Sequence, residues 1–255
     1  MHERSWKDKV ALVTGGGSGI GRASCLAFAR VGAAVMVSDI ETVHGLETVR
    51  LVEQAGGRAL FVRADVSVAS EAQAMVAATV AGFGRLDCAF NNAGIAGARG
   101  TVADYEDAAW ERVIAVNLVG VRLCMKHELK QMLIQGSGAI VNNASILGTV
   151  GFAGASAYVA AKHGVLGLTK AAALEYGTSG IRVNAVCPGF IETPMLEDAG
   201  FTTDPAVRAS IEALHPMNRL GRPEEGADVA VWLCGPEASF ITGHPLLIDG
   251  GYIAR

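Results

Sequence analysis

The sequence lacks several features that mark whole classes of protein. Its 21 Lys and Arg are outnumbered by 25 Asp and Glu, for a net charge of −4 at pH 7, which argues against the basic surface that nucleic-acid binding requires. No uncharged apolar run reaches the roughly 18 residues of a membrane-spanning helix, and the polar start of the chain predicts no signal peptide. We therefore expect a cytoplasmic protein with no nucleic-acid or membrane partner.

Patterns of disulfide or metal chemistry are also missing. The five cysteines are widely spaced without a Cys-x-x-Cys pair, so we expect five reduced thiols that pack as small apolar residues. The six histidines are dispersed and form no His-Glu-x-x-His motif, which predicts no metal site. Because there is no repeat, low-complexity tract or Pro/Ser-rich linker, residues 1–255 are predicted to form a single domain.

What the chain does have is a regular alternation of short apolar segments and helix-like segments. Near-continuous apolar runs are typical of strands buried on both faces of a parallel sheet. We expect strands at Val10–Thr14, Ala34–Ser38, Ala59–Val62, Leu86–Phe90, Ala139–Asn142, Arg182–Val186 and Pro245–Ile248. A Ser70/Gln73 capping box predicts the start of one helix, and Ser156–Tyr176 has the length and composition of another. The predicted class is α/β: a doubly wound, Rossmann-like domain with a mostly parallel seven-stranded sheet and helices on both faces.

One stretch, at about 188–223, does not follow this alternation. It contains several Pro and Gly residues without clear periodicity. Long irregular segments in compact domains often serve as lids or binding elements. We therefore expect residues 188–223 to form a loop that covers the substrate.

A glycine-rich turn follows the first predicted strand and precedes a helix. In this context, glycines let the backbone approach a pyrophosphate, and the helix N-terminus supplies free N–H groups and a positive dipole end. The alternative is a flexible turn, but the strand before it and the helix after it favour dinucleotide binding. The predicted cofactor-binding residues of this turn are Gly15, Ser18, Gly19, Ile20 and Gly21.

The choice of cofactor depends on Asp39, at the end of the second predicted strand and 20 residues after Gly19. A carboxylate at this place accepts hydrogen bonds from ribose hydroxyls and repels a 2′-phosphate. The next residue, Ile40, offers no cation that would neutralise such a phosphate. Asp39 therefore predicts NAD rather than NADP; the alternative is an Asp that caps a helix or faces solvent.

Tyr158 and Lys162 are spaced i, i+4 on a predicted helix and so share one face. Ser145 follows the fifth predicted strand, 13 residues before the tyrosine. A free tyrosine has a pKa near 10 and is a poor base at neutral pH, but a neighbouring ammonium favours the phenolate and lowers that pKa. A Tyr-x-x-x-Lys pair alone is common; its position after a dinucleotide motif and a strand-end serine favours catalysis.

With these motifs together, the chain resembles the short-chain dehydrogenase/reductase family in its shorter, single-domain branch. The resemblance runs from about Lys9 to Gly251. It is carried by Thr14–Gly21, Asp65-Val66, Asn91–Gly94, Asn117, Ser145, Tyr158-Val-Ala-Ala-Lys162, Pro188-Gly189 with Thr193, and Ile248–Gly251. The catalytic positions show no departure from the family pattern.

The resemblance implies a role for each of these residues. Tyr158 would be the general acid/base, Ser145 would stabilise charge on the substrate oxygen, and Lys162 would lower the tyrosine pKa and hold the nicotinamide ribose. Asn117 would anchor a water in a proton relay, although by itself it is interpreted as a buried, satisfied helix residue. The further cofactor contacts implied are Asp65 and Val66 at the adenine, Asn92 in the groove, and Ile191 and Thr193 at the carboxamide. Without the resemblance, Asn91–Gly94 would be interpreted as a strand-end turn.

The substrate is less well defined than the reaction. Apolar residues after Pro188 predict a pocket for a cyclic or aromatic alcohol or ketone, although they equally suit the packing of a lid. These residues are Phe190, Ile191, Met195, Leu196, Phe201, Ile211, Leu214 and Met217. Ala96, Gly97, Ile146 and Leu147 are expected on the opposite wall, with Arg99 as the only nearby cation. Family membership implies a homotetramer.

The sequence thus predicts an NAD-dependent alcohol dehydrogenase or ketone reductase. Two alternatives stay open: a catalytically silent NAD-sensing protein and an NADP-dependent carbonyl reductase. A nucleotide-sugar epimerase is disfavoured because that branch carries a longer C-terminal substrate domain. An enoyl reductase is disfavoured because Ser145 and the tyrosine–lysine spacing suit carbonyl chemistry.

Overall fold

The computed structural model describes residues 6–254 and has seven strands in one parallel sheet, in the order β3-β2-β1-β4-β5-β6-β7. The strands are β1 (Val10–Thr14), β2 (Ala34–Asp39), β3 (Arg58–Arg63), β4 (Cys88–Asn91), β5 (Gly138–Asn143), β6 (Ile181–Pro188) and β7 (Pro245–Ile248). All seven predicted strands are confirmed, with ends that shift by at most two residues. The predicted mostly parallel sheet is parallel in every pairing.

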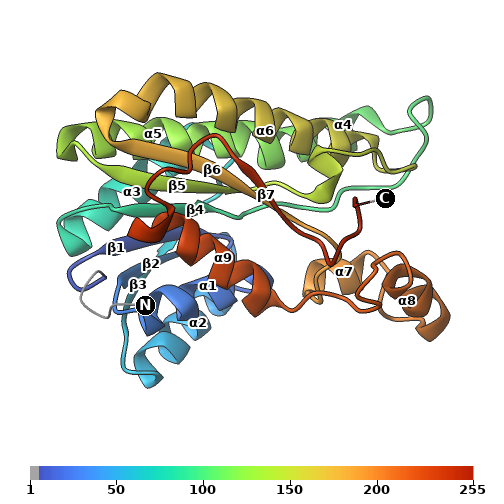
Figure 1. Ribbon diagram of the computed structural model, residues 1–255, viewed down its shortest axis with the longest axis horizontal. Coiled ribbons are helices and arrows are strands. Elements are labelled where there is room, and N and C mark those ends of the chain that lie inside the picture. The colour runs from blue at the N-terminus through green and yellow to red at the C-terminus, as the bar shows by residue number, and fades with distance from the viewer. Residues whose placement is uncertain (1–5, 255) are drawn as a thin grey trace.

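Helices cover both faces of the sheet, as predicted (Figure 1). They are α1 (Gly19–Arg30), α2 (Thr42–Gln54), α3 (Ala69–Phe83), α4 (Asp107–Ile114), α5 (Val121–Gln135), α6 (Ser156–Tyr176), α7 (Pro194–Asp198), α8 (Pro205–Glu212) and α9 (Pro223–Cys234). Buried side chains of α1, α2 and α9 form one core with the sheet, and those of α3, α5 and α6 form the other. Because both faces are covered, the strands are apolar throughout.

The order of the strands reverses between β1 and β4, because the chain builds outward from β1 in both directions. In doubly wound sheets, ligands bind outside the carboxyl ends of the strands at this switch point. The turn after β1 and the segment after β4 both lie there, since the two strands are paired in parallel. The fold thereby brings the glycine turn and the residues after β4 to the same edge of the sheet.

Two local predictions are wrong. The stretch 188–223 is not irregular throughout: it contains α7 and α8, each beginning at a proline, a residue preorganised for the first helical position. The two helices lie together at one end of the molecule (Figure 1). Ser70 does not cap α3, which begins one residue earlier, at Ala69. The carboxylate of Glu71 instead accepts the Asp65 backbone N–H at 2.8 Å, and so ties the helix to the preceding loop.

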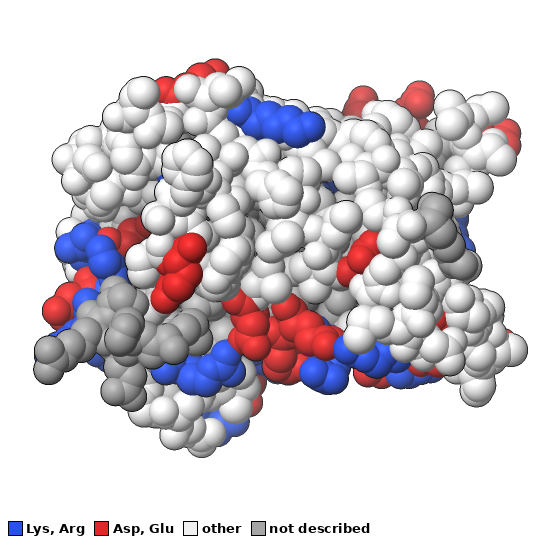
Figure 2. Space-filling view, in the orientation of Figure 1, with Lys and Arg blue, Asp and Glu red and all other residues white. Residues whose placement is uncertain are grey.

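Charged side chains of both signs are interspersed on one face of the molecule. On the face drawn in Figure 2, Lys and Arg side chains are scattered among acidic ones and form no continuous basic area. Within residues 6–254, no helix combines the length and hydropathy that a membrane span requires. The same residues contain no group of three His, Cys, Asp or Glu side chains placed to hold a metal ion.

Candidate active site

The turn between β1 and α1 has a backbone that only glycine can adopt without strain. Gly15 and Gly19 have φ angles of 62° and 49°, in the left-handed region that disfavours other residues. A Cβ added to Gly21 would lie 1.9 Å from the Gly15 carbonyl oxygen, so the first turn of α1 packs directly on the loop. Ser18 precedes α1 and makes no side-chain cap, which leaves the helix N–H groups free to bind an anion.

Asp39 is the last residue of β2 and faces this turn. Its carboxylate accepts the Gly17 N–H at 2.8 Å and the Glu41 N–H at 2.9 Å. It also lines a large cavity together with Ile40. Asp39 therefore holds the glycine turn in place and presents negative charge to the cavity. Neither α1 nor α2 has a side-chain cap, so the helix-capping alternative for Asp39 is not supported.

A cavity of about 580 Å³ runs along the carboxyl ends of the strands. It brings together nearly all of the predicted site residues: Gly15, Ser18, Gly19, Ile20, Asp39, Asp65, Val66, Asn92, Ser145, Tyr158, Lys162, Ile191 and Thr193. Two predicted residues do not line it. Gly21 lies beneath the turn, and Asn117 is fully buried behind the segment that follows β4.

Asn117 lies in η2 (Ala115–Gly120), a π-helical segment between α4 and α5. Its Oδ1 accepts the Ile95 N–H and its Nδ2 donates to the Ile95 carbonyl, both at 2.8 Å. Asn117 thus fixes the backbone that follows β4. This confirms the interpretation of Asn117 as a buried helix residue whose side-chain polar atoms are hydrogen-bonded. The π-helical turn was not predicted from the sequence; such turns are often found at functional sites. The proton-relay role of Asn117 stays a prediction.

Asn92 connects the ends of three strands. Its Nδ2 donates to the Thr14 and Gly15 carbonyls at 3.1 Å, and its Oδ1 accepts from Asn143 Nδ2 at 2.9 Å. Asn91 ends β4, and the next three residues, Asn92, Ala93 and Gly94, follow without regular secondary structure and line the cavity. The Asp65 carboxylate, after β3, accepts from the Ser67 N–H and hydroxyl at 2.9 and 2.6 Å.

Tyr158 and Lys162 lie on one face of α6, as predicted. The Lys162 ammonium is 5.3 Å from the centre of the Tyr158 ring and donates to the Asn143 carbonyl at 2.6 Å. Ser145 follows β5, and its hydroxyl accepts the Leu147 N–H at 3.1 Å. Three elements, β5, the 3-10 helix η3 (Ile146–Gly148) that follows it, and α6, thus bring a phenol, an ammonium and a hydroxyl to one cavity wall.

The expected lowering of the tyrosine pKa is not found. Burial raises the pKa of Tyr158 to about 12, although the Ser145 side chain acts in the opposite direction. Burial lowers the pKa of Lys162 to about 8, with a smaller raising effect from Cys187. The sequence argument considered only the charge of the ammonium. In the structure desolvation dominates, because it disfavours the charged form of both groups.

Three phenylalanine rings form one apolar end of the cavity. Phe190 packs edge-to-face on Phe152 and Phe201, with ring centres 6.1 and 5.4 Å apart. Of the apolar residues predicted after Pro188, five line the cavity: Phe190, Ile191, Met195, Leu196 and Phe201. Ile211, Leu214 and Met217 do not, whereas Ala96, Gly97, Ile146 and Leu147 line it as expected. Phe152 was missed; its place just before α6 is the only signal in the sequence.

Fold and site together define a Rossmann-type, dinucleotide-binding α/β domain. A family model described as enoyl-(acyl carrier protein) reductase matches residues 15–253. The cis-4-hydroxycyclohexanecarboxylate dehydrogenase of Sinomonas cyclohexanicum is 47% identical over 251 residues, 98% of each chain. The cyclohexanol dehydrogenase of Acinetobacter sp. (strain SE19) is 44% identical, covering 98% of this chain and 97% of the relative. A crystal structure of levodione reductase is 40% identical with a TM-score of 0.94, covering 98% of this chain and 99% of that one.

The chain belongs to the short-chain dehydrogenase/reductase family of oxidoreductases. The match covers the glycine turn, the Ser145 region and the Tyr158–Lys162 helix within one continuous alignment. The resemblance drawn from the motifs is thereby confirmed, as is the fold class.

Proposed function

We propose that this protein is an NAD-dependent oxidoreductase that interconverts a secondary alcohol and a ketone on an apolar, cyclic substrate. The observation that carries this proposal is the single cavity that joins the glycine turn to Ser145, Tyr158 and Lys162. The turn fits a dinucleotide because Gly15, Ser18 and Gly19 line the cavity, where a backbone without Cβ atoms lets a pyrophosphate approach closely, and because α1 opens with uncapped N–H groups. The nicotinamide supplies hydride chemistry when bound.

The protein's own contribution is the proton and the charge on the substrate oxygen. With the pKa of Tyr158 at about 12, the phenol carries its proton at neutral pH and donates it to a ketone oxygen as that oxygen gains charge. The Ser145 hydroxyl stabilises the same oxygen as a hydrogen-bond donor. The Lys162 ammonium, held by the Asn143 carbonyl, is placed to favour the phenolate left behind and to hold the nicotinamide ribose. Asn117 would connect Lys162 to solvent through a bound water.

The preference for NAD rests on Asp39. Its carboxylate accepts hydrogen bonds from the Gly17 and Glu41 N–H groups and lines the cavity. There it would accept hydrogen bonds from the ribose hydroxyls of NAD and repel the 2′-phosphate of NADP. The cation nearest this turn is Arg22, whose guanidinium is already engaged with Thr48 Oγ1 at 3.0 Å and with the Gly17 carbonyl. Asp65, Val66, Asn92, Ile191 and Thr193 would complete the cofactor contacts along the cavity.

A cyclic substrate is supported by the three phenylalanine rings at one end of the cavity and by the names of the relatives. Those relatives include dehydrogenases of cyclohexanol, which is neutral, and of cis-4-hydroxycyclohexanecarboxylate, which carries a carboxylate. The stretch 188–223, with α7 and α8, would cover such a ring, because its first part lines the cavity.

A panel of cyclic secondary alcohols and ketones, assayed by NADH absorbance with NAD and NADP in parallel, tests the proposal. We expect turnover with several members and a higher kcat/KM with NAD. Equal or better kcat/KM with NADP would refute the cofactor assignment and favour the carbonyl-reductase alternative. Turnover of an enoyl thioester alone would refute carbonyl chemistry. NADH binding without turnover of any member would favour the sensor alternative.

We also propose a cytoplasmic homotetramer. All five cysteines are free and buried, which suits a reducing compartment. Exposed apolar side chains at Trp232 on α9, Phe240 and Leu247 on the edge strand β7 offer surface for subunit contacts. Light scattering on the eluted protein tests the assembly; a mass near that of one chain, 26.3 kDa, would overturn it.

A further inference from the structure

Arg99 lies at the substrate end of the cavity, in the segment that follows β4. Gly97, two residues earlier, has a φ of 79°, and a Cβ there would lie 2.4 Å from a Val113 methyl. The Gly100 N–H donates to the Gly154 carbonyl at 3.2 Å, and Gly100 forms a bridge with Ala155. Arg99 is therefore anchored on both sides, next to the backbone that leads into the Tyr158 helix.

The guanidinium of Arg99 stacks on the aromatic wall. Its Cζ is 4.2 Å from the centre of the Phe201 ring, and that ring packs on Phe190 and Phe152 at 5.4 and 6.4 Å. Stacking of this kind uses the flat face of a guanidinium and leaves its N–H edge free to donate. Within residues 6–254, that edge has no ion pair or hydrogen bond.

The other charged groups near this end leave Arg99 available. Lys162 is buried and donates to the Asn143 carbonyl. Asp198 on α7 lines the cavity too, but no ion pair joins it to Arg99. The neighbouring walls are apolar, so an anionic group entering this end needs a charged partner. A guanidinium with a free edge binds a carboxylate through two parallel hydrogen bonds.

We infer that Arg99 determines substrate specificity: the preferred substrate is a ring that carries a carboxylate on a carbon away from the reacting one. The alcohol or ketone carbon would face Tyr158 and Ser145, the ring would pack on the phenylalanines, and the carboxylate would meet the Arg99 edge. This inference rests on the proposed function and narrows its substrate class from cyclic alcohols to cyclic hydroxy acids and keto acids.

The test compares two ring substrates of nearly equal shape, cis-4-hydroxycyclohexanecarboxylate and its uncharged primary amide. Wild-type enzyme is assayed beside Arg99→Gln and a matched control, Arg58→Gln. Arg58 is also an exposed arginine stacked on a phenylalanine, 5.7 Å from the Phe83 ring, but it lies outside the cavity.

We expect wild type and Arg58→Gln to prefer the carboxylate over the amide by about tenfold in kcat/KM, the scale of a charge-assisted hydrogen bond. Arg99→Gln should bring the ratio close to one, mainly through a higher KM, because the contact is remote from the reacting atoms. Arg99→Lys should recover part of the preference. Added salt should raise the KM of the carboxylate alone.

Failures of the two proposals give different results. Turnover of other cyclic alcohols or ketones of the panel but of neither compound would overturn only this inference. Turnover of no panel member would overturn the proposed function and this inference with it. Turnover of both compounds with equal kcat/KM in wild type would overturn only the role of Arg99. The same holds if Arg99→Gln lowers kcat/KM equally for both compounds, since the arginine would then only shape the aromatic wall.

Discussion

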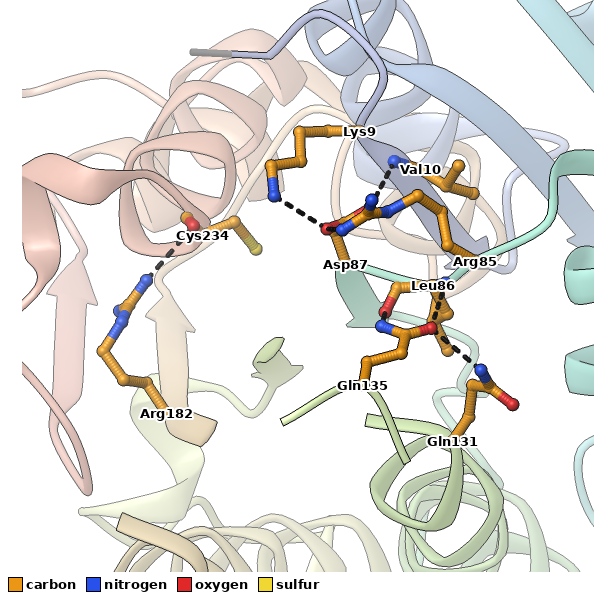
Figure 3. Close-up of polar contacts among 9 residues, drawn as sticks. All are labelled: Lys9, Val10, Arg85, Leu86, Asp87, Gln131, Gln135, Arg182 and Cys234. Carbon is orange, nitrogen blue, oxygen red and sulfur yellow. Dashed lines mark hydrogen bonds and ion pairs between the residues drawn. The ribbon is translucent and has the colours of Figure 1, made fainter. Parts of the chain in front are cut away.

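At the amino ends of β1 and β4, a buried carboxylate is surrounded by donors. At the carboxyl ends of the sheet, a partly buried phenol and a buried ammonium have no ion-pair partner among residues 6–254. Asp87 accepts from Lys9 Nζ at 2.9 Å, from the Val10 N–H at 3.0 Å and from two Arg85 nitrogens at 2.7 Å (Figure 3). Burial raises its pKa, but the bonds from Arg85, Lys9 and Val10 outweigh burial and hold the pKa below its usual value.

The environments at the two ends of the sheet therefore act on charged side chains in opposite directions. Around Asp87 the charged form is favoured, so the interaction stabilises the fold. At the carboxyl ends, the pKa values of Tyr158 and Lys162 shift against the charged forms. At neutral pH the desolvated Lys162 ammonium costs stability, whereas the Tyr158 phenol is neutral in the folded and the unfolded chain. Shifted pKa values of this kind are typical of sites where a proton must move. The comparison predicts that substitutions at the first end alter stability, and substitutions at the second end alter turnover.

The largest effect is expected for Tyr158→Phe, which removes the proton donor but keeps the ring. Turnover should fall by roughly 10²- to 10⁴-fold, the contribution of a general acid or base. NADH binding, followed by fluorescence, should be retained, and the free energy of unfolding should not decrease because the ring keeps its packing and only the hydroxyl is lost. Near-normal turnover would refute the catalytic assignment, and a large loss of stability would break the comparison.

Glu128 on α5 is a second uncompensated group. Its Oε2 accepts from Asn91 Nδ2 at 3.0 Å, while its Oε1 has no hydrogen-bond partner among residues 6–254. Burial raises its pKa from 4.5 to about 8, with a smaller lowering by Asn91. As the pH rises from 4.5 to about 8, the unfolded chain releases this proton and the folded protein keeps it. The contribution of Glu128 to stability therefore falls across that window.

Glu128→Gln keeps an oxygen acceptor for Asn91 and cannot ionise. Relative to wild type, we expect the variant to gain stability between pH 5 and pH 8, by up to a few kcal/mol. Urea unfolding at both pH values measures this gain. The matched control is Glu175→Gln, at an exposed position on α6, which should show no such change. A gain that is equal at both pH values would contradict the assignment of a buried, protonated Glu128.

A smaller effect is expected at the amino ends. Asp87→Asn should lower the free energy of unfolding at pH 7 by about 2 kcal/mol, because a buried acceptor loses charge-assisted bonds while Lys9 and Arg85 stay half-exposed. The depressed pKa means that this contribution is present above about pH 3.8, the ordinary value, and is lost as the pH falls through the lower folded value.

The control for Asp87 is Asp228→Asn, whose ion pair with Arg30 is more than half exposed on both sides. This variant should cost under about 1 kcal/mol. Steady-state turnover of Asp87→Asn should stay near that of wild type. If turnover fell sharply while stability was unchanged, the division of roles between the two ends would be wrong.

Features set by local sequence were predictable, whereas those set by distant contacts were not. The glycine turn, Asp39 at the end of β2 and the i, i+4 pair on α6 follow from short patterns, and the structure places them on one cavity. The Asp87 cluster joins residues 77 and 78 positions apart, and Glu128 meets Asn91 across 37. Desolvation of Tyr158 likewise depends on what packs around it, so the direction of its pKa shift could not be read from the spacing of Lys162.

The smallest expected effect concerns Gln135, which clamps the chain just before β4. Its Nε2 donates to the Leu86 carbonyl at 2.7 Å and its Oε1 accepts the Leu86 N–H at 2.9 Å (Figure 3). Gln135→Ala should cost about 1 kcal/mol, since it leaves buried backbone groups without these partners, and should lower Tm by about 2–4 °C. Gln131→Ala removes only a bond to Gln135 and should cost less. Turnover at 25 °C should be unchanged in both variants; a loss of turnover in Gln135→Ala would show that the amino ends influence the reaction after all.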